Sequence, residues 1–232
     1  MPRILLVDDD LDLCTMLSQY LTGDGFDCEM AHDGNSGLMR ALSHSYDALV
    51  LDVMMPRLNG FDLVRRLREV KSTPIIMLTA RGEEVDSIIG LEIGADDYLA
   101  KPCSPQVLAA HLRAVLRRTN RTEQNPTNTD PISVGQVTLY PGSLQVVDGN
   151  RNIELTSTEF NLLHLLMGNA GQVISKDTLS EKGLGRKLTA YDRSIDIHIS
   201  NLRRKLHRDT PPTTQRICTL RGAGYLYALT NE

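Results

Sequence analysis

The sequence has no apolar run that approaches the roughly 20 residues needed to cross a bilayer. Its first residues turn acidic at once and show neither the apolar stretch nor the cleavage site of a signal peptide. Cysteine is scarce and lacks the C-x-x-C spacing of a zinc site or a disulfide framework, at Cys14, Cys28, Cys103 and Cys218. These absences predict a soluble, cytoplasmic protein with reduced thiols and no membrane partner.

The composition predicts a globular chain of two domains. The 232 residues are 41% hydrophobic and 23% charged. The most polar segment, 119–131, has the composition of a linker. The predicted first domain, 1–118, carries 12 Lys and Arg against 18 Asp and Glu, a net charge of −6, whereas 132–232 carries 12 against 9, a net charge of +3. The first half would repel a nucleic acid, and the second half could approach one.

The first half alternates short apolar runs with longer segments of helical period. The runs with strand character are 3–7, 27–31, 48–51, 74–78 and 98–99. The segments of helical period are 11–23, 35–44, 60–70, 84–93 and 105–118. This order is typical of an α/β domain with a parallel sheet and helices on both faces.

The residues that follow four of these strands are polar or charged. The first strand runs into Asp8, Asp9 and Asp10, the third into Asp52, the fourth into Thr79, and the fifth into Lys101. Because ligands of such sheets bind at the carboxyl ends of the strands, we expect these side chains to meet in one crevice. An acidic run alone is more often a solvated loop or a helix N-cap, but four strand ends that serve one reaction favour a site.

The predicted crevice has the chemistry of phosphoryl transfer. Crowded carboxylates need a cation, and a hard, oxygen-rich site suits Mg²⁺. The ion, the Lys101 amine and the Thr79 hydroxyl could together stabilise negative charge on a phosphoryl group during transfer to a carboxylate. The best-placed acceptor is Asp52.

These motifs resemble the CheY-like receiver family over residues 3 to about 118. The resemblance implies a (βα)5 domain with the sheet order 2-1-3-4-5, phosphorylated by a sensor histidine kinase. It implies that Mg²⁺ is held by Asp8, Asp9, Asp52 and the backbone carbonyl of Met54. It also implies a switch made of Thr79, Tyr98 and Lys101, with a cis peptide bond before Pro102. Tyr98 is equally compatible with an ordinary half-buried strand aromatic.

The second half begins with short strands and continues with three helices. Strands are expected at 132–140, 144–147 and 152–155, separated by turn signals. Thr156 and Glu159 have the spacing of a capping box that opens a helix at 160–168, and a second helix is expected near 176–182. The third, 192–206, carries one apolar stripe and basic residues mainly on its other faces. Such a helix fits the DNA major groove, although a solvated amphipathic helix has the same pattern.

The chain then shows a hairpin with a Gly-x-Gly turn near 216–227. With it, the second half resembles the winged-helix domain of the OmpR/PhoB family. The resemblance implies an α+β domain at 132–232 that binds promoter DNA at tandem half-sites. It implies that Arg193 and His198 contact DNA phosphates and that Asn201 and Arg203 contact base edges. Further DNA contacts are implied for Arg204, Thr219 and Arg221. The loop with Arg186 and Lys187 resembles a contact to RNA polymerase, or is a flexible basic loop.

The resemblance predicts a two-component response regulator that controls transcription and is not a conventional enzyme, although it would slowly dephosphorylate itself. Within the family, the stretches 6–10, 52–56, 188–193 and 197–206 resemble the envelope-stress regulators. The family implies a homodimer through helix four, strand five and helix five. Three departures from its pattern are Cys103, Val107 and His111, and the last two predict weaker or more apolar dimer contacts.

Two other classes of protein remain open. A phosphatase of the haloacid dehalogenase type also forms an aspartyl phosphate with Mg²⁺, but it needs an Asp where this chain has Met54. A receiver that acts only through protein contacts is disfavoured by the basic second half.

Overall fold

The computed structural model describes residues 1–80, 84–124, 130–189, 192–207 and 215–229. The chain divides into two compact units, Met1–Leu116 and Arg117–Glu232. Among the described residues, no helix combines the length and the apolar character that crossing a membrane requires.

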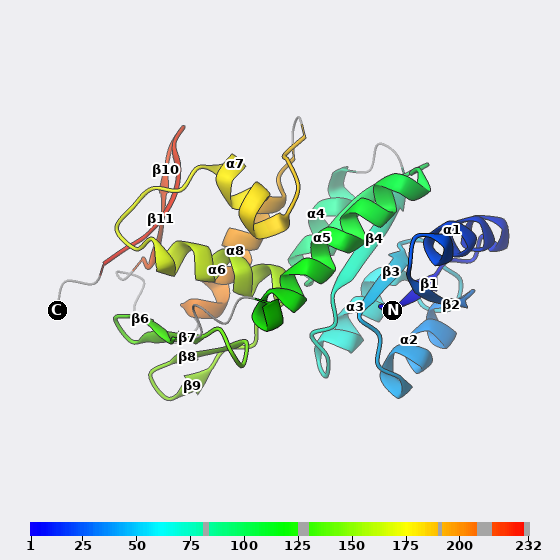
Figure 1. Ribbon diagram of the computed structural model, residues 1–232, viewed down its shortest axis with the longest axis horizontal. Helices are drawn as coiled ribbons and strands as arrows, with labels where there is room; N and C mark the ends of the chain where they lie inside the picture. Colours follow the sequence, from blue (N-terminus) through cyan, green and yellow to red (C-terminus); the bar gives the residue numbers. More distant parts are fainter. Residues whose placement is uncertain (81–83, 125–129, 190–191, 208–214, 230–232) are drawn as a thin grey trace. The chain divides into compact units, whose positions relative to one another are not determined.

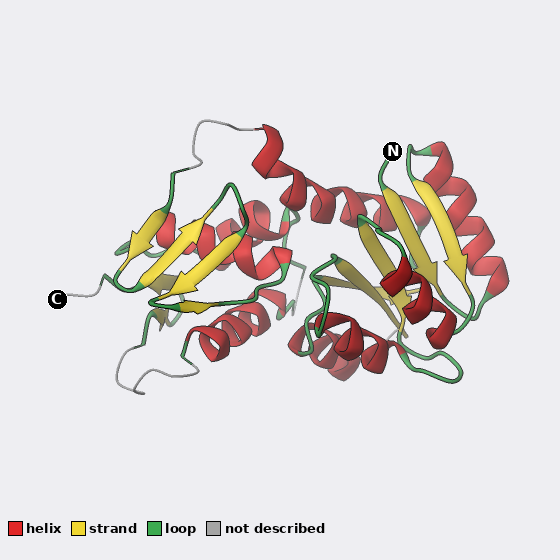
Figure 2. Ribbon diagram, turned by 90° about the horizontal axis from the view of Figure 1, so that it is seen from below, coloured by secondary structure: helices red, strands yellow, loops and turns green. Residues whose placement is uncertain are grey.

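The first unit is built around a five-stranded parallel sheet with the order β2-β1-β3-β4-β5 (Figure 2). The strands are β1 (Arg3–Val7), β2 (Asp27–Ala31), β3 (Ala48–Asp52), β4 (Ile75–Ala80) and β5 (Asp97–Lys101). The helices are α1 (Leu11–Gly23), α2 (Gly34–Ser43), α3 (Gly60–Arg68), α4 (Glu84–Glu92) and α5 (Pro105–Gln124). The predicted element order and sheet order are therefore confirmed.

The alternation of side chains along the strands divides the core of this unit into two layers. Ile4 and Leu6 of β1 pack with residues of α1 and α5 on one face of the sheet. Leu5 and Val7 pack with α2 and α3 on the other face. Because helices cover both faces, all five residues of β3 are buried. Asp52 is the last residue of this buried strand, so its polar side chain is also largely enclosed, at 6% exposed.

The second unit combines an antiparallel sheet, helices and a hairpin (Figure 1). The four-stranded sheet is β6 (Ile132–Val134), β7 (Val137–Tyr140), β8 (Gln145–Asp148) and β9 (Arg151–Asn152). The helices are α6 (Ser157–Gly168), α7 (Lys176–Leu179), the π-helix η2 (Ser180–Leu184) and α8 (Ser194–Leu206). The hairpin is β10 (Ile217–Leu220) and β11 (Gly224–Tyr227). This is the winged-helix architecture that the sequence predicts.

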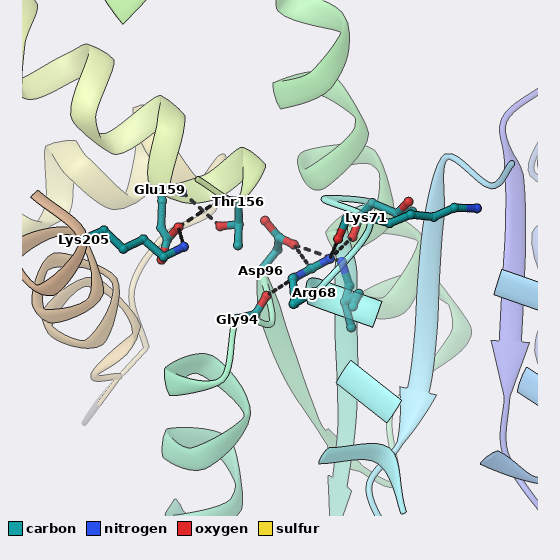
Figure 3. A network of polar contacts seen from close by, with 9 residues as sticks. Arg68, Lys71, Gly94, Asp96, Thr156, Glu159 and Lys205 are labelled. Carbon is teal, nitrogen blue, oxygen red and sulfur yellow. Dashed lines mark hydrogen bonds and ion pairs between the residues drawn. The ribbon is translucent and has the colours of Figure 1, made fainter. Parts of the chain in front are cut away.

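The local signals in this unit act as predicted. Thr156 caps α6 and Glu159 returns the bond to the Thr156 N–H at 2.9 Å, which completes the capping box (Figure 3). The predicted apolar stripe of α8 is buried in the core, at Ile195, Ile199, Leu202 and Leu206. The core of this unit therefore holds one side of α8 against the other helices.

Several element boundaries differ from prediction. Helix α5 continues to Gln124, so the first part of the predicted linker 119–131 is helical. The predicted strand 132–140 is two strands because Gly135, with φ of 59°, turns the chain between them. The predicted strand 152–155 is shorter and earlier, at Arg151–Asn152. Helix α8 begins two residues late because the Asp192 side chain accepts from the Ser194 N–H at 2.9 Å.

A single arginine joins α3 to the loops beside β4 and β5 (Figure 3). Arg68 donates from Nε to the Gly94 carbonyl at 2.9 Å and from Nη1 to the Thr73 carbonyl at 2.7 Å. Its Nη2 lies 3.1 Å from Oδ2 of Asp96, whose side chain is fully buried. Asp96 in turn accepts from the backbone N–H of Ile75 at 3.0 Å. The buried carboxylate therefore depends on Arg68 for its countercharge.

We expect Arg68→Ala to lower the free energy of unfolding of the first unit by about 3–5 kcal/mol, because Asp96 would remain buried without its countercharge. The control is Arg65→Ala on the same helix, where the pair with Asp62 is exposed on both sides and contributes less than about 1 kcal/mol. Urea unfolding of the full chain and of both variants measures the difference. Equal losses in the two variants would contradict this account.

Candidate phosphoacceptor pocket and DNA-binding surface

The carboxyl ends of β1, β3 and β5 bring three charged side chains into contact. Asp8 follows β1 directly, Asp52 ends β3, and Lys101 ends β5. The Lys101 Nζ lies 2.6 Å from Oδ2 of Asp8 and 2.9 Å from Oδ1 of Asp52. The parallel register produces this meeting, because neighbouring strands that end together present their next residues at one edge.

Burial and charge set the protonation of this group. Burial raises the pKa of Asp52, and the Asp8 charge adds to the rise, while the bond from Lys101 opposes it. Burial lowers the pKa of Lys101, but its bonds to the two carboxylates outweigh that effect and raise it. Lys101 is therefore a fixed ammonium between two carboxyl groups.

A third carboxylate completes an acidic pocket. Oxygen atoms of Asp8, Asp9 and Asp52 all lie within 4.8 Å of one another. Three carboxylates against the single Lys101 ammonium leave two negative charges when all are ionised. The donors are hard oxygens, and a divalent cation would balance the two negative charges that remain, so the residues fit Mg²⁺.

The acidic run serves two purposes. Asp8 is buried and faces Lys101, and Asp9 is exposed beside it. Asp10 instead caps α1, since its Oδ1 accepts from the Leu13 N–H at 2.9 Å. The alternative interpretation of the run as an N-cap is therefore right for Asp10 alone.

The other residues predicted from the receiver resemblance lie in or next to β3, β4 and β5. Thr79 is buried in β4, one position past the pair Asp52 and Leu78. Tyr98 is half-buried in β5, and the Met54 side chain is 68% exposed two residues after Asp52. The peptide bond between Lys101 and Pro102 is cis, as the resemblance implies. The switch roles of Thr79 and Tyr98 and the ligand role of the Met54 carbonyl stay predictions.

Three residues that were not predicted from the sequence support this pocket. A Cβ at Gly60 would lie 2.2 Å from the carbonyl oxygen of Asp52, so only glycine lets α3 begin there. The Asp8 carbonyl oxygen lies 3.3 Å from the His32 Nδ1 and 3.6 Å from the Cys14 Sγ. The Asn59-Gly60 dipeptide is a turn signal, but His32 and Cys14 have no local signal.

Exposure divides the predicted DNA contacts of the second unit. Four are exposed in the described structure, Arg193, Arg204, Thr219 and Arg221. His198 is fully buried and Asn201 is 2% exposed, so contact with DNA would require both to become accessible. Their burial does not support the predicted contacts, and both remain predictions from the resemblance. Among the loop residues, Lys187 is exposed.

Two predicted contact residues have partners inside their own unit. Arg186 pairs through Nη1 with Asp192, whose side chain is 1% exposed, and its carbonyl accepts from the Ser180 hydroxyl at 2.8 Å. Arg203 donates to the Ile217 carbonyl at 2.9 Å and to the Thr219 hydroxyl at 2.7 Å. Arg186 thus holds the loop before α8 together, which argues against a guanidinium free to contact polymerase.

The charges at the start of β5 are also used within the first unit. Oδ2 of Asp97, whose side chain is fully buried, lies 2.8 Å from Nδ1 of His111. Oδ2 of Asp96 lies 3.1 Å from Nη2 of Arg68. These two carboxylates are therefore not available for ion pairs with a second copy of the chain. Val107, which lies on α5 like His111, is 43% exposed.

Comparison with known proteins agrees with this arrangement. Residues 4–113 match the response regulator receiver domain, and residues 150–227 match the C-terminal domain of transcriptional regulatory proteins. The chain therefore belongs to the two-component response regulators with a receiver and an OmpR/PhoB-type DNA-binding domain. This membership decides against a phosphatase and against a receiver that acts through protein contacts alone.

Within that family the chain is CpxR-like. It is 48% identical over 231 residues to the transcriptional regulatory protein CpxR of Escherichia coli (strain K12), which covers 97% of this chain and 98% of that protein. It is 43% identical over 226 residues to the CpxR homolog of Haemophilus influenzae, with the same coverage. A solved structure of a RitR mutant matches 98% of this chain and 99% of its own at a TM-score of 0.77 and 26% identity.

The pocket geometry predicts that Asp9 and Asp10 differ in their effect on the cation. We expect Asp9→Asn to weaken Mg²⁺ binding at least about 10-fold. Loss of a residue that only supports a metal ligand typically lowers metal affinity by about 10-fold or more, and loss of a ligand's own charge should lower it at least as much. Asp10→Asn should leave Mg²⁺ affinity nearly unchanged, because Asn caps a helix as well as Asp does. Calorimetric titration with Mg²⁺ measures both. The same loss of Mg²⁺ affinity in both variants would contradict the assignment of Asp9, and not Asp10, to the pocket.

Proposed function

We propose that Asp52 accepts a phosphoryl group from a sensor histidine kinase and that this event governs promoter binding by the second unit. The observation that carries the proposal is the position of Lys101 between Asp8 and Asp52, at 2.6 and 2.9 Å. The acceptor oxygen would form a bond to phosphorus in line with the bond that breaks to the kinase histidine.

Asp8, Asp9, Asp52 and the Met54 carbonyl would hold Mg²⁺, which neutralises negative charge on the transferred group. The Lys101 ammonium would turn from the two carboxylates to a phosphoryl oxygen, and Thr79 would donate its hydroxyl proton to another. Tyr98 would follow Thr79 and reshape the surface of α4, β5 and α5. The same pocket would admit water for slow self-dephosphorylation.

The second unit would read tandem half-sites as a dimer in the cytoplasm. Arg193 and Arg204 of the α8 region and Thr219 and Arg221 of the hairpin are exposed, which supports contact with phosphates and groove edges. Dimer formation would use the face of α4, β5 and α5. Since Asp96 and Asp97 are paired internally, apolar contact such as Val107 would contribute more there. Lys187 remains a candidate contact to RNA polymerase.

Incubation with acetyl phosphate and Mg²⁺ should add one base-labile phosphoryl group to the chain. Asp52→Ala should abolish the label, because it removes the proposed acceptor and Asp8, the other carboxylate beside Lys101, is less exposed, at 2% against 6%. Asp12→Ala, an exposed carboxylate on α1, is the control and should be labelled like the wild type. Intact-mass spectrometry measures the added group. Labelling of Asp52→Ala at the wild-type level would overturn the assignment of the acceptor.

Arg221→Ala and Arg193→Ala should each weaken DNA binding about equally for all sequences. The slope of log affinity against log salt should become shallower by about 0.9 for each phosphate that a variant no longer neutralises. The measurement is a titration of the phosphorylated full chain with a duplex selected from a random pool, at several salt concentrations. Arg65→Ala, on the receiver, should keep the wild-type slope. An unchanged slope in both test variants would remove them from the interface.

A further inference from the structure

A chain of polar contacts joins α7, α8 and the β10–β11 hairpin, which we call the wing. Lys176 of α7 lies 2.7 Å from Oδ1 of Asp196 in α8. The Tyr225 hydroxyl of β11 donates to the same carboxylate. Arg203, farther along α8, holds β10 through the Ile217 carbonyl and the Thr219 hydroxyl. The contacts therefore link α7, α8 and both strands of the wing, which include the two regions proposed to contact DNA.

The register of the wing places the side chains of Thr219 and Tyr225 on one face. Thr219 and Tyr225 are directly opposite in the antiparallel ladder, so their side chains point to the same side. Arg203 reaches that side from α8. Its guanidinium carbon lies 5.7 Å from the centre of the Tyr225 ring, within the range of a cation–π contact. One guanidinium thus contacts both members of the cross-strand pair.

The Tyr225 side chain is fixed at both ends. Asp196 and Arg203 are seven residues apart, two helical turns, and so lie on one face of α8. The ring lies beside Arg203, and its hydroxyl is bonded to Asp196. Burial and the Asp196 bond raise the pKa of Tyr225, so its hydroxyl keeps the proton that it donates. The wing is therefore held against two turns of α8.

The Thr219 hydroxyl is the exposed group at the end of these contacts. Its oxygen accepts from the Arg203 Nη2 at 2.7 Å, so the lone pair on that side is used. A threonine hydroxyl also carries one proton that it can donate. Thr219 is exposed, and its oxygen is polarised by a cation, which strengthens the bond its proton can make. A phosphate oxygen is an acceptor suited to this proton.

We infer that Arg203 is a positioning residue, which fixes the wing to α8 and turns the Thr219 hydroxyl proton outward to a DNA phosphate. This inference rests on the proposed DNA contact of α8 and the wing. It replaces the sequence-based expectation that Arg203 reads a base edge. To reach a base, the guanidinium would have to release both the Ile217 carbonyl and the Thr219 oxygen.

The test uses the phosphorylated full chain and a duplex selected from a random pool by the wild type. Arg203→Lys keeps the positive charge but loses the planar guanidinium that bonds to two acceptors at once, and Thr219→Val keeps the side-chain shape but loses the hydroxyl. Each should weaken binding about 5-fold, the value of one hydrogen bond, and equally for a panel of single-base variants of the duplex. The double variant should be no weaker than either single variant, because both remove the same bond to phosphate.

Arg204→Lys combined with Thr219→Val is the matched control. Arg204 is exposed on α8 and its Nη2 bonds to Asn201 on the same helix, so the two losses should multiply. Hydroxyl-radical footprinting adds a second readout. Arg203→Lys should lose protection under the wing while protection along α8 persists, which general unfolding would not produce. Circular dichroism confirms that each variant is folded.

Two results would overturn the inference. A relaxed preference at one base pair in Arg203→Lys would make Arg203 a base reader. Independent, multiplying losses for Arg203→Lys and Thr219→Val would separate Arg203 from the hydroxyl. If Arg203→Lys fails to fold, Arg203→Gln takes its place in the cycle with Thr219→Val, and multiplying losses again contradict the inference. Absence of DNA binding by the wild type would instead refute the proposed function.

Discussion

The structure of the first unit depends on one ammonium group that separates two carboxylates. Asp8 and Asp52 are 2% and 6% exposed, and two buried like charges would otherwise repel each other strongly. Lys101 reaches both and so joins the ends of β1, β3 and β5. With Asp9 included, the three carboxylates exceed the Lys101 ammonium by two negative charges, which a divalent cation would balance.

Much of this site is predictable from sequence because it follows from local patterns and one rule. Apolar runs locate the strands, and the rule that parallel strands end at one edge brings Asp52 to Lys101. The capping box of Thr156 and Glu159 is equally local, since its partners are three residues apart. Sheet order came from the family resemblance, because the periodicity of single strands does not define which strands are neighbours.

The remaining features depend on partners that lie far along the chain. Arg68 pairs with Asp96, and Arg203 with Ile217 and Thr219, and neither pairing has a local signal. A basic residue on an amphipathic helix has the same sequence pattern whether it meets DNA or its own wing. Helix α5 overran its predicted end at 118 because polar, charged residues without glycine or proline are compatible with both a linker and an exposed helix.

The wing has a second consequence for the behaviour of the free protein. Ile174 pairs with Tyr225 on one side of β11, so in the described chain β10 is the strand whose outer backbone groups lack a neighbouring strand. Since the Arg216 carbonyl accepts from the Ala228 N–H, alternation turns the Ile217 carbonyl to that open side, where the Arg203 guanidinium covers it. Open strand edges invite strand addition and aggregation. By bonding to the Ile217 carbonyl, the Arg203 guanidinium occupies an acceptor that an added strand would need at this edge.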